Sequence, residues 1–120
     1  MRQITIALCF VLPACGCGGT KTTPAWVEQL QAQESSQRLH AARALGDRRS
    51  DAPLAVPALA DALKDTDAFV RREAANSLGR IGPDAKVAVP HLTAALRDRT
   101  PKVRQAAAQA LKNIDQEAAR

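Results

Sequence analysis

The sequence has few aromatic residues: one tryptophan, two phenylalanines and no tyrosine stand among 120 residues. Surfaces that bind single-stranded nucleic acid combine basic side chains with aromatic rings on which the bases stack. The densest basic stretch, RDRTPKVR at 97–104, has no aromatic residue beside it. The formal net charge of +5 permits an anionic partner. Without aromatic residues, however, the sequence does not favour nucleic acid as that partner.

Residues typical of catalytic and metal sites are also scarce. The only histidines are His40 and His91, and neither has a second ligand three or four residues away. A zinc site needs about four converging ligands. Neither histidine has an acidic or nucleophilic partner that recurs with it, so we expect both on the surface. The sequence therefore predicts no metal, no cofactor and no enzymatic activity.

No apolar run is long enough to span a bilayer, which takes about 20 residues. Ile4 to Leu12 is a largely apolar run of nine residues, and it follows the single positive charge of Arg2. A run of this length fits the apolar region of a secretory signal peptide. The alternative is a buried core helix, but Pro13 and the glycines after it would break its continuation. We therefore expect residues 1–14 to be an export signal.

The three cysteines all lie at the N-terminal end, at positions 9, 15 and 17. Leu12-Pro13-Ala14-Cys15 resembles the bacterial lipobox, although Pro13 departs from the residue type usual there. In lipoproteins the lipobox cysteine is acylated and becomes the new N-terminus. The resemblance implies that Cys15 carries the lipid, with Cys17 as the alternative. It also implies a membrane protein of the bacterial cell envelope, facing the periplasm or the exterior, whose glycine-rich residues 15–23 form a flexible tether.

The rest of the sequence repeats with a period of 33 residues. The repeated positions, which need no gap, are Pro24/Pro57/Pro90, Leu30/Leu63/Leu96, Arg38/Arg71/Arg104, Ala41/Ala74/Ala107, Ala42/Ala75/Ala108 and Leu45/Leu78/Leu111. The second and third units share further positions, including Asp65/Asp98 and Val70/Val103. We divide the domain, residues 24–120, into units 24–56, 57–89 and 90–120.

Each unit reads as two helices, because its apolar residues recur three and four positions apart. A single helix pair cannot bury its own leucine face, whereas stacked pairs bury one another. The prediction is an all-α chain, a right-handed α-solenoid of about three stacked helix pairs. Expected caps of the second helices are Ser35 or Ser36, Asp67, and Thr100 followed by Pro101.

Two features of the helix ends carry further expectations. Gly46 and Gly79 suit the left-handed conformation that ends many helices. Pro57 and Pro90 lie either at a helix start or inside a helix that begins near Asp51 or Asp84, where they would kink it. The sequence leaves that alternative open.

The second and third units, VPALADALKDTDAFVRREAANSLGRIG and VPHLTAALRDRTPKVRQAAAQALKNI, resemble short, alanine-rich HEAT repeats of the bilin-lyase type. The resemblance implies a polar ladder in which turn aspartates and helix arginines stack from unit to unit. The residues at these positions are Asp65, Asp98, Arg38, Arg71 and Arg104. The first unit departs from the pattern at Ala32 and Gln37, as terminal repeats do when one side faces solvent.

The resemblance and the scarcity of catalytic residues together predict a non-catalytic module that binds an unidentified protein partner and is anchored to a membrane by lipid. One alternative is an accessory protein similar to bilin lyases, which act on chromophore-bearing proteins. Another is a nucleic-acid-binding helical repeat, which would require the export signal to be wrong.

Overall fold

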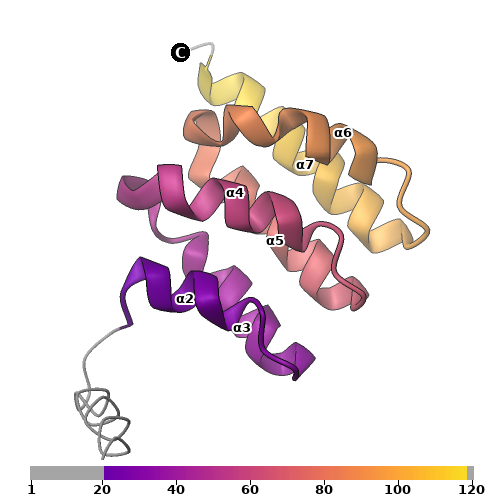
Figure 1. Cartoon of the computed structure of the whole chain (residues 1–120). Coiled ribbons are helices and arrows are strands. Elements are labelled where there is room, and N and C mark those ends of the chain that lie inside the picture. The colour runs from indigo at the N-terminus through magenta and orange to yellow at the C-terminus, as the bar shows by residue number, and fades with distance from the viewer. Residues whose placement is uncertain (1–20, 119–120) are drawn as a thin grey trace, which may run out of the picture.

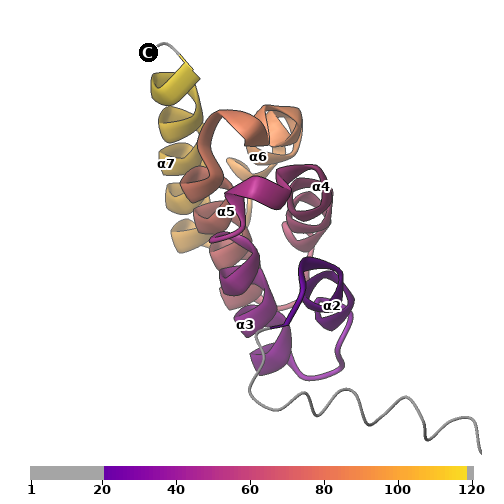
Figure 2. The same cartoon turned by 90° about the vertical axis from the view of Figure 1, so that its left-hand side faces the viewer.

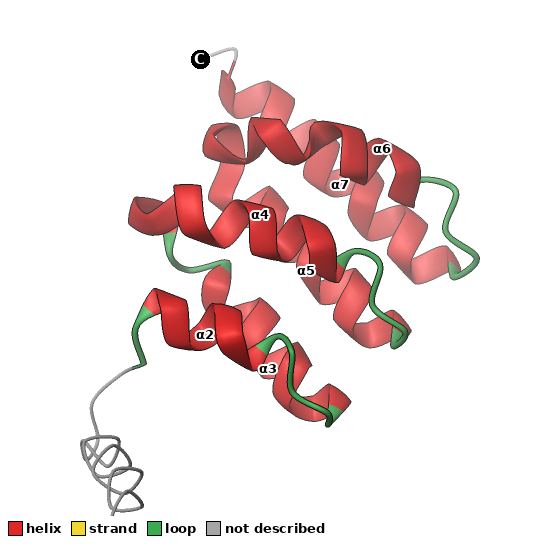
Figure 3. Cartoon of the chain, viewed as in Figure 1, coloured by secondary structure: helices red, strands yellow, loops and turns green. Residues whose placement is uncertain are grey.

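The computed structural model describes residues 21–118, and this part of the chain is helical without any strand (Figures 1 and 3). The helices in chain order are α2 (Thr23–Gln29), α3 (Ser35–Leu45), α4 (Ala52–Ala62), α5 (Ala68–Ile81), α6 (Val89–Ala95) and α7 (Pro101–Ala118). Two short 3-10 helices, η1 (Arg49–Asp51) and η2 (Gly82–Ala88), join one helix pair to the next. The prediction of an all-α chain is confirmed.

The helices form two layers that stack along one direction. Figure 2 shows α2, α4 and α6 in one layer and α3, α5 and α7 in the other. The central helix α5 packs against α3 on one side and α7 on the other, and it also contacts α4 of its own pair. The chain is therefore a solenoid of three helix pairs, as the repeat predicts.

The core lies between the layers and between successive pairs. Its largest fully buried side chains include Leu45, Leu59, Leu78, Ile81, Leu92 and Ile114. The repeated alanines Ala41, Ala74 and Ala107 are also fully buried. Their small side chains let the second helices of neighbouring pairs approach closely, while leucine and isoleucine fill the space between layers. The same repeated positions thus build the same interface twice.

The expected helix caps have different outcomes. Asp67 is the N-cap of α5, and its carboxylate accepts a hydrogen bond from the backbone N–H of Phe69 at 2.7 Å. Helix α7 begins at Pro101, as expected for the first helical position. The expectation for α3 is wrong, because its N-cap is Glu34 and both Ser35 and Ser36 lie inside the first turn.

The glycine expectation is wrong at both positions. Gly46 follows α3 with a φ of −64°, and Gly79 lies inside α5, so neither has the left-handed conformation. The left-handed glycine is instead Gly82, which ends α5 with a φ of 78°. Gly46 is needed for a different reason, since a Cβ there would lie 2.7 Å from the Cβ of Ser77 on the neighbouring α5.

We expect Gly46→Ala to lower the free energy of unfolding by about 1–3 kcal/mol, the usual cost of forcing an extra methyl group into a packed site. Urea denaturation followed by circular dichroism measures the change. Because the φ of Gly46 suits any residue, the cost comes from the contacts with the Ser77 side chain and the Arg80 guanidinium on α5. An unchanged urea midpoint would show that α3 and α5 can separate freely at this point.

The structure resolves the alternative that the prolines leave open. Helix α4 begins at Ala52, so Pro57 lies inside it. Helix α6 begins at Val89, which places Pro90 in its first turn. The two units differ because the segment before Pro90 forms the 3-10 helix η2, whereas the corresponding part of the second unit belongs mainly to α4.

Candidate functional site

The residues singled out from the sequence fall into two groups. The lipidation candidates Cys15 and Cys17, with the proposed export signal, lie outside the described residues. The five ladder residues lie on the edge of the solenoid where the turns inside the helix pairs follow one another.

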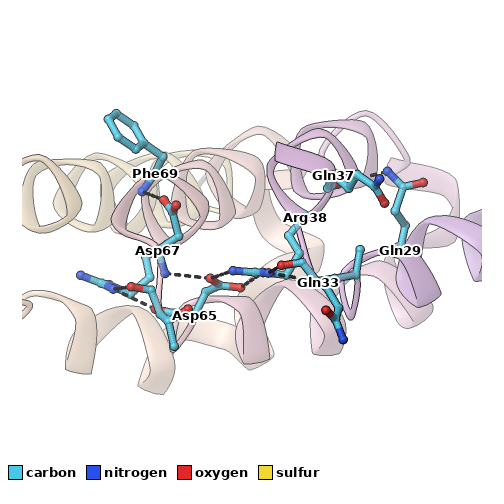
Figure 4. A network of polar contacts seen from close by, with 10 residues as sticks. Gln29, Gln33, Gln37, Arg38, Asp65, Asp67 and Phe69 are labelled. Carbon is cyan, nitrogen blue, oxygen red and sulfur yellow. Dashed lines mark hydrogen bonds and ion pairs between the residues drawn. The ribbon is translucent and has the colours of Figure 1, made fainter. Parts of the chain in front are cut away.

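The first step of the ladder joins the first and second units. Arg38 donates from Nε and Nη2 to the two carboxylate oxygens of Asp65, at 2.8 and 3.0 Å (Figure 4). Its Nη1 donates to the backbone carbonyls of Ala32 and Gln33 in its own turn, at 2.9 and 2.8 Å. The hydrogen bond to Asp65 raises the pKa of Arg38 above its ordinary value. One guanidinium thus fixes its own turn and holds the next unit.

The second step repeats this geometry between the second and third units. Arg71 donates from Nε and Nη2 to the Asp98 carboxylate at 2.8 and 3.2 Å, and from Nη1 to the Asp65 carbonyl at 2.8 Å. Both side chains are well buried, with exposed fractions of 6% for Arg71 and 11% for Asp98. Two-pronged arginine–carboxylate pairs are strong because both hydrogen bonds are charge-assisted.

The third arginine keeps only the part of the geometry that lies within its own unit. Nη1 of Arg104 donates to the Asp98 carbonyl at 2.7 Å. Within residues 21–118, its Nε and Nη2 groups have no hydrogen-bond partner. In Arg38 and Arg71 the same two groups donate hydrogen bonds to the aspartate carboxylate of the next unit.

Two turn carboxylates, those of Asp67 and Asp98, have pKa values below the ordinary value. Burial raises the pKa of Asp98, but the hydrogen bonds from Arg71 and from the Thr100 backbone outweigh it and lower the pKa overall. The hydrogen bond from the Phe69 backbone lowers the pKa of Asp67. Both groups therefore stabilise the fold in their ionised form.

We expect the melting temperature to fall as the pH drops below about 4, near the ordinary pKa of an aspartate. A carboxyl whose pKa is lower when folded contributes stability above its unfolded pKa, and this is lost as the pH falls through the folded pKa. Calorimetry from pH 7 to pH 2 measures the fall. Asp98→Asn should melt lower at pH 7 and depend less on pH. If the melting temperature of Asp98→Asn depended on pH as steeply as that of the unchanged chain, the role given to the Asp98 carboxylate would be contradicted.

A second polar cluster lies on the layer of second helices, and sequence reasoning missed it. Glu73 of α5 is only 5% exposed, and its carboxylate pairs with Arg43 at 3.4 Å and with Arg80 at 3.6 Å. Position 73 corresponds to His40 and Ala106 in the other units, so the repeat gives no signal there. The only hint in the sequence is that a glutamate stands directly before the repeated alanines Ala74 and Ala75.

The surface of the third unit that points away from the second unit is apolar. We call this surface the end face and define it by Val89, Leu96 and Leu111, which are exposed or half-buried. An open hollow of about 660 Å³ lies on it, lined by Lys86, Val89, Leu111, Lys112, Ile114 and Asp115. Leu96 is 38% exposed, whereas Leu63, at the same repeat position, is 5% exposed. The end face thus resembles the interface that the second unit buries, but nothing in residues 21–118 covers it.

The two histidines differ from one another. His40 is exposed, as expected, and its ring contacts Trp26 edge-on. His91 is half-buried, and its Nδ1 is buried without a hydrogen-bond partner, so its placement on the open surface was wrong. Over residues 21–118, no three His, Cys, Asp or Glu side chains are grouped so as to hold a metal ion. None of the helices described is both long and apolar enough to cross a membrane.

Comparison with known proteins identifies the repeat. A family model described as HEAT repeats matches residues 23–119. Among solved structures, a chain from the complex of CpcE and CpcF of phycocyanin lyase from Nostoc sp. PCC7120 is 35% identical, with a TM-score of 0.72 over 82% of this chain. Human deoxyhypusine hydroxylase is 29% identical, with a TM-score of 0.68 over 82% of this chain. An engineered protein is 27% identical, with a TM-score of 0.65 over 79% of this chain.

The chain spans less than half the length of these structures: 39% of the phycocyanin lyase chain, 34% of the hydroxylase and 46% of the engineered protein. No curated protein matches the sequence. Two of the three similar structures come from proteins named as a lyase and a hydroxylase. These similarities contradict the prediction that the chain has no enzymatic activity. A sequence with two histidines and no tyrosine can still be similar to chains of enzymes.

Proposed function

The chain belongs to the HEAT-repeat family, and from this premise we propose that it is a repeat module that binds a protein partner through its end face. Helical solenoids bury each unit against its neighbours, and a unit without a neighbour leaves an apolar surface open to another protein. Large exposed apolar patches rimmed by charged residues are typical of protein interaction sites.

One observation carries the proposal: the end face exposes the side chains that the previous unit buries. Leu78 is fully buried and Val56 is 1% exposed, whereas Leu111 and Val89 at the same repeat positions are half-buried. Because the positions are equivalent, the difference comes from the absence of a further unit within residues 21–118 and not from the residue types. A partner would remove this surface from water.

Photo-crosslinking in living cells tests the proposal. A photoreactive amino acid placed at Leu96, on the end face, should give a discrete crosslinked protein product. The matched control is Leu54, which is also exposed, at 54%, but lies on α4 away from the end face. Equal products at both positions, or none at Leu96, would contradict binding through the end face.

We further propose that a lipid on Cys15 anchors the module in the bacterial cell envelope, facing the periplasm or the exterior. The support is the resemblance of residues 12–15 to the lipobox, after an apolar run too short to span a bilayer. Stable anchoring takes more than one acyl chain or a second membrane-binding signal, and the diacylated cysteine of a lipoprotein satisfies this.

Cys15→Ser is expected to abolish incorporation of radiolabelled palmitate and to leave the unprocessed precursor. Gel autoradiography after membrane fractionation measures both effects. Cys17→Ser is the matched control and should keep the label. Label lost only in Cys17→Ser would move the lipid to that cysteine, and a wild-type chain that is unlabelled and uncleaved would contradict the anchor.

A second candidate function is a role similar to that of the bilin lyases. The 35% identity to a chain of the phycocyanin lyase complex favours it, although this chain spans only 39% of that structure. Coexpression with a phycocyanin subunit and its bilin tests it, because an attached bilin fluoresces on a denaturing gel stained with zinc. A gel without a fluorescent subunit band would rule this role out for the chain acting by itself.

A further inference from the structure

We infer that the end face takes a helix pair of a partner protein that carries an aspartate in its turn and stacks in the register of the repeat. The inference rests on the proposed function and adds the chemistry of the partner. It follows from three features of the third unit: a pre-oriented arginine, a basic turn and an apolar surface of known register.

The arginine is Arg104, which already has the orientation that binds the next unit. In all three units the repeated arginine donates from Nη1 to the carbonyl at one turn position, at 2.9 Å in Arg38, 2.8 Å in Arg71 and 2.7 Å in Arg104. This bond turns the other edge of the guanidinium outward. In the first two units that edge binds the aspartate of the following turn. In Arg104 it is open among the described residues, so the third unit is prepared for one more carboxylate.

The charges around the third turn favour an acidic partner. Arg97, Arg99 and Lys102 are all exposed and lie in the same stretch as Arg104. The one acidic residue among them, Asp98, is already bound by Arg71. The second turn is different, because Asp65 and Asp67 accompany Lys64 there. A partner turn with carboxylates would therefore approach the third unit with complementary charge.

The apolar part of the end face fixes how the partner would sit. In the second unit, Leu63, Leu78 and Ile81 are 5%, 0% and 0% exposed beneath the third unit. Leu96 and Leu111 occupy the positions of Leu63 and Leu78 on the end face, where Leu96 is 38% exposed and Leu111 half-buried, whereas Ile114 at the position of Ile81 is already buried. A helix pair in the same register would cover Leu96 and Leu111 and bring its turn to Arg104.

A second copy of this chain does not supply the required surface. In a head-to-tail copy the position of the ladder aspartate is Ala32, which offers no carboxylate to Arg104. Trp26 stands where the later units have Leu59 and Leu92, and Gln37 stands where they have a buried valine. The first unit therefore lacks both the charge and the shape that the end face accepts.

The test converts the first unit of one chain into a defined partner. The probe chain carries Trp26→Leu, Ala32→Asp and Gln37→Val, together with Arg104→Met so that it cannot extend into a polymer. Mixed with wild-type chain, it is expected to form a one-to-one complex in sedimentation velocity. The wild-type chain alone should stay monomeric. All samples share the same N-terminal residues, so any association through that segment cancels in the comparison.

Two matched controls isolate the carboxylate and the arginine. A probe with asparagine in place of the new Asp at position 32, or a wild-type chain carrying Arg104→Met, should bind about tenfold more weakly or worse. Circular dichroism checks the probe, and Ala32→Asp with Arg104→Met replaces it if the multiple variant is unfolded.

Absence of a complex with a folded probe, or a complex as tight in both controls, would overturn the inference. Self-association of the wild-type chain through the end face would also overturn it, because a second copy would then be the occupant. These outcomes are separate from the crosslinking result at Leu96, which tests whether any protein binds there.

Discussion

Leu78→Ala is expected to lower the free energy of unfolding by about 2–5 kcal/mol, the range for deleting a fully buried leucine side chain. Leu78 lies on α5, the helix that packs against both α3 and α7, and it has no exposed surface. The truncation removes apolar burial and leaves a cavity between the second and third units. Because these units hold each other in place, the loss should appear as one cooperative shift of the urea midpoint.

The same repeat position provides a graded control. Leu111 is the equivalent residue of the third unit and is only half-buried, so Leu111→Ala should cost less than Leu78→Ala. Leu54→Ala, at a position that is 54% exposed, should change stability by no more than about 0.5 kcal/mol. Equal effects at positions 78 and 111 would mean that the third unit does not bury the second.

The fold could be predicted because its main determinant is periodic. An offset of 33 residues, kept without gaps, defines which leucines and alanines share an interface. These side chains are buried in the first two units, whereas in the third unit Leu96 and Ala108 are exposed and Leu111 is half-buried. Helix starts were less predictable. The same proline position lies inside α4 at Pro57 but in the first turn of α6 at Pro90, and local sequence does not distinguish the two.

Features that depend on one tertiary contact could not be predicted. Gly46 was expected to end a helix in the left-handed conformation, but it serves to let Ser77 approach. Glu73 is buried between two arginines 30 residues back and 7 residues ahead along the chain, at a position that does not repeat. Neither contact has a local sequence signature. The end face itself is visible only when the exposed fractions of equivalent residues are compared.

Arg71→Met is expected to destabilise the chain by about 3–5 kcal/mol, the range for breaking a buried ion pair on one side. Methionine keeps part of the volume but offers no hydrogen bonds. Asp98 then retains its charge, 11% exposed, with only the backbone N–H of Thr100 as a donor. The carbonyl of Asp65 also loses the bond from Arg71 Nη1. Thermal and urea unfolding at pH 7 measure the loss.

Arg104→Met is the matched control, because it changes the same repeat position at a site where no other unit among the described residues contributes a carboxylate. Arg104 is exposed and makes one hydrogen bond within the described residues, so its loss should cost about 1 kcal/mol or less. Adding Asp98→Asn to Arg71→Met removes the unpaired charge, and the double variant should be more stable than the sum of the single effects predicts. Strict additivity would show that Arg71 acts through its own turn alone. If the ladder stabilises the chain by joining units, the effects of Arg71→Met and Asp98→Asn are not additive. An added unit with a turn aspartate would gain the same interaction energy at Arg104.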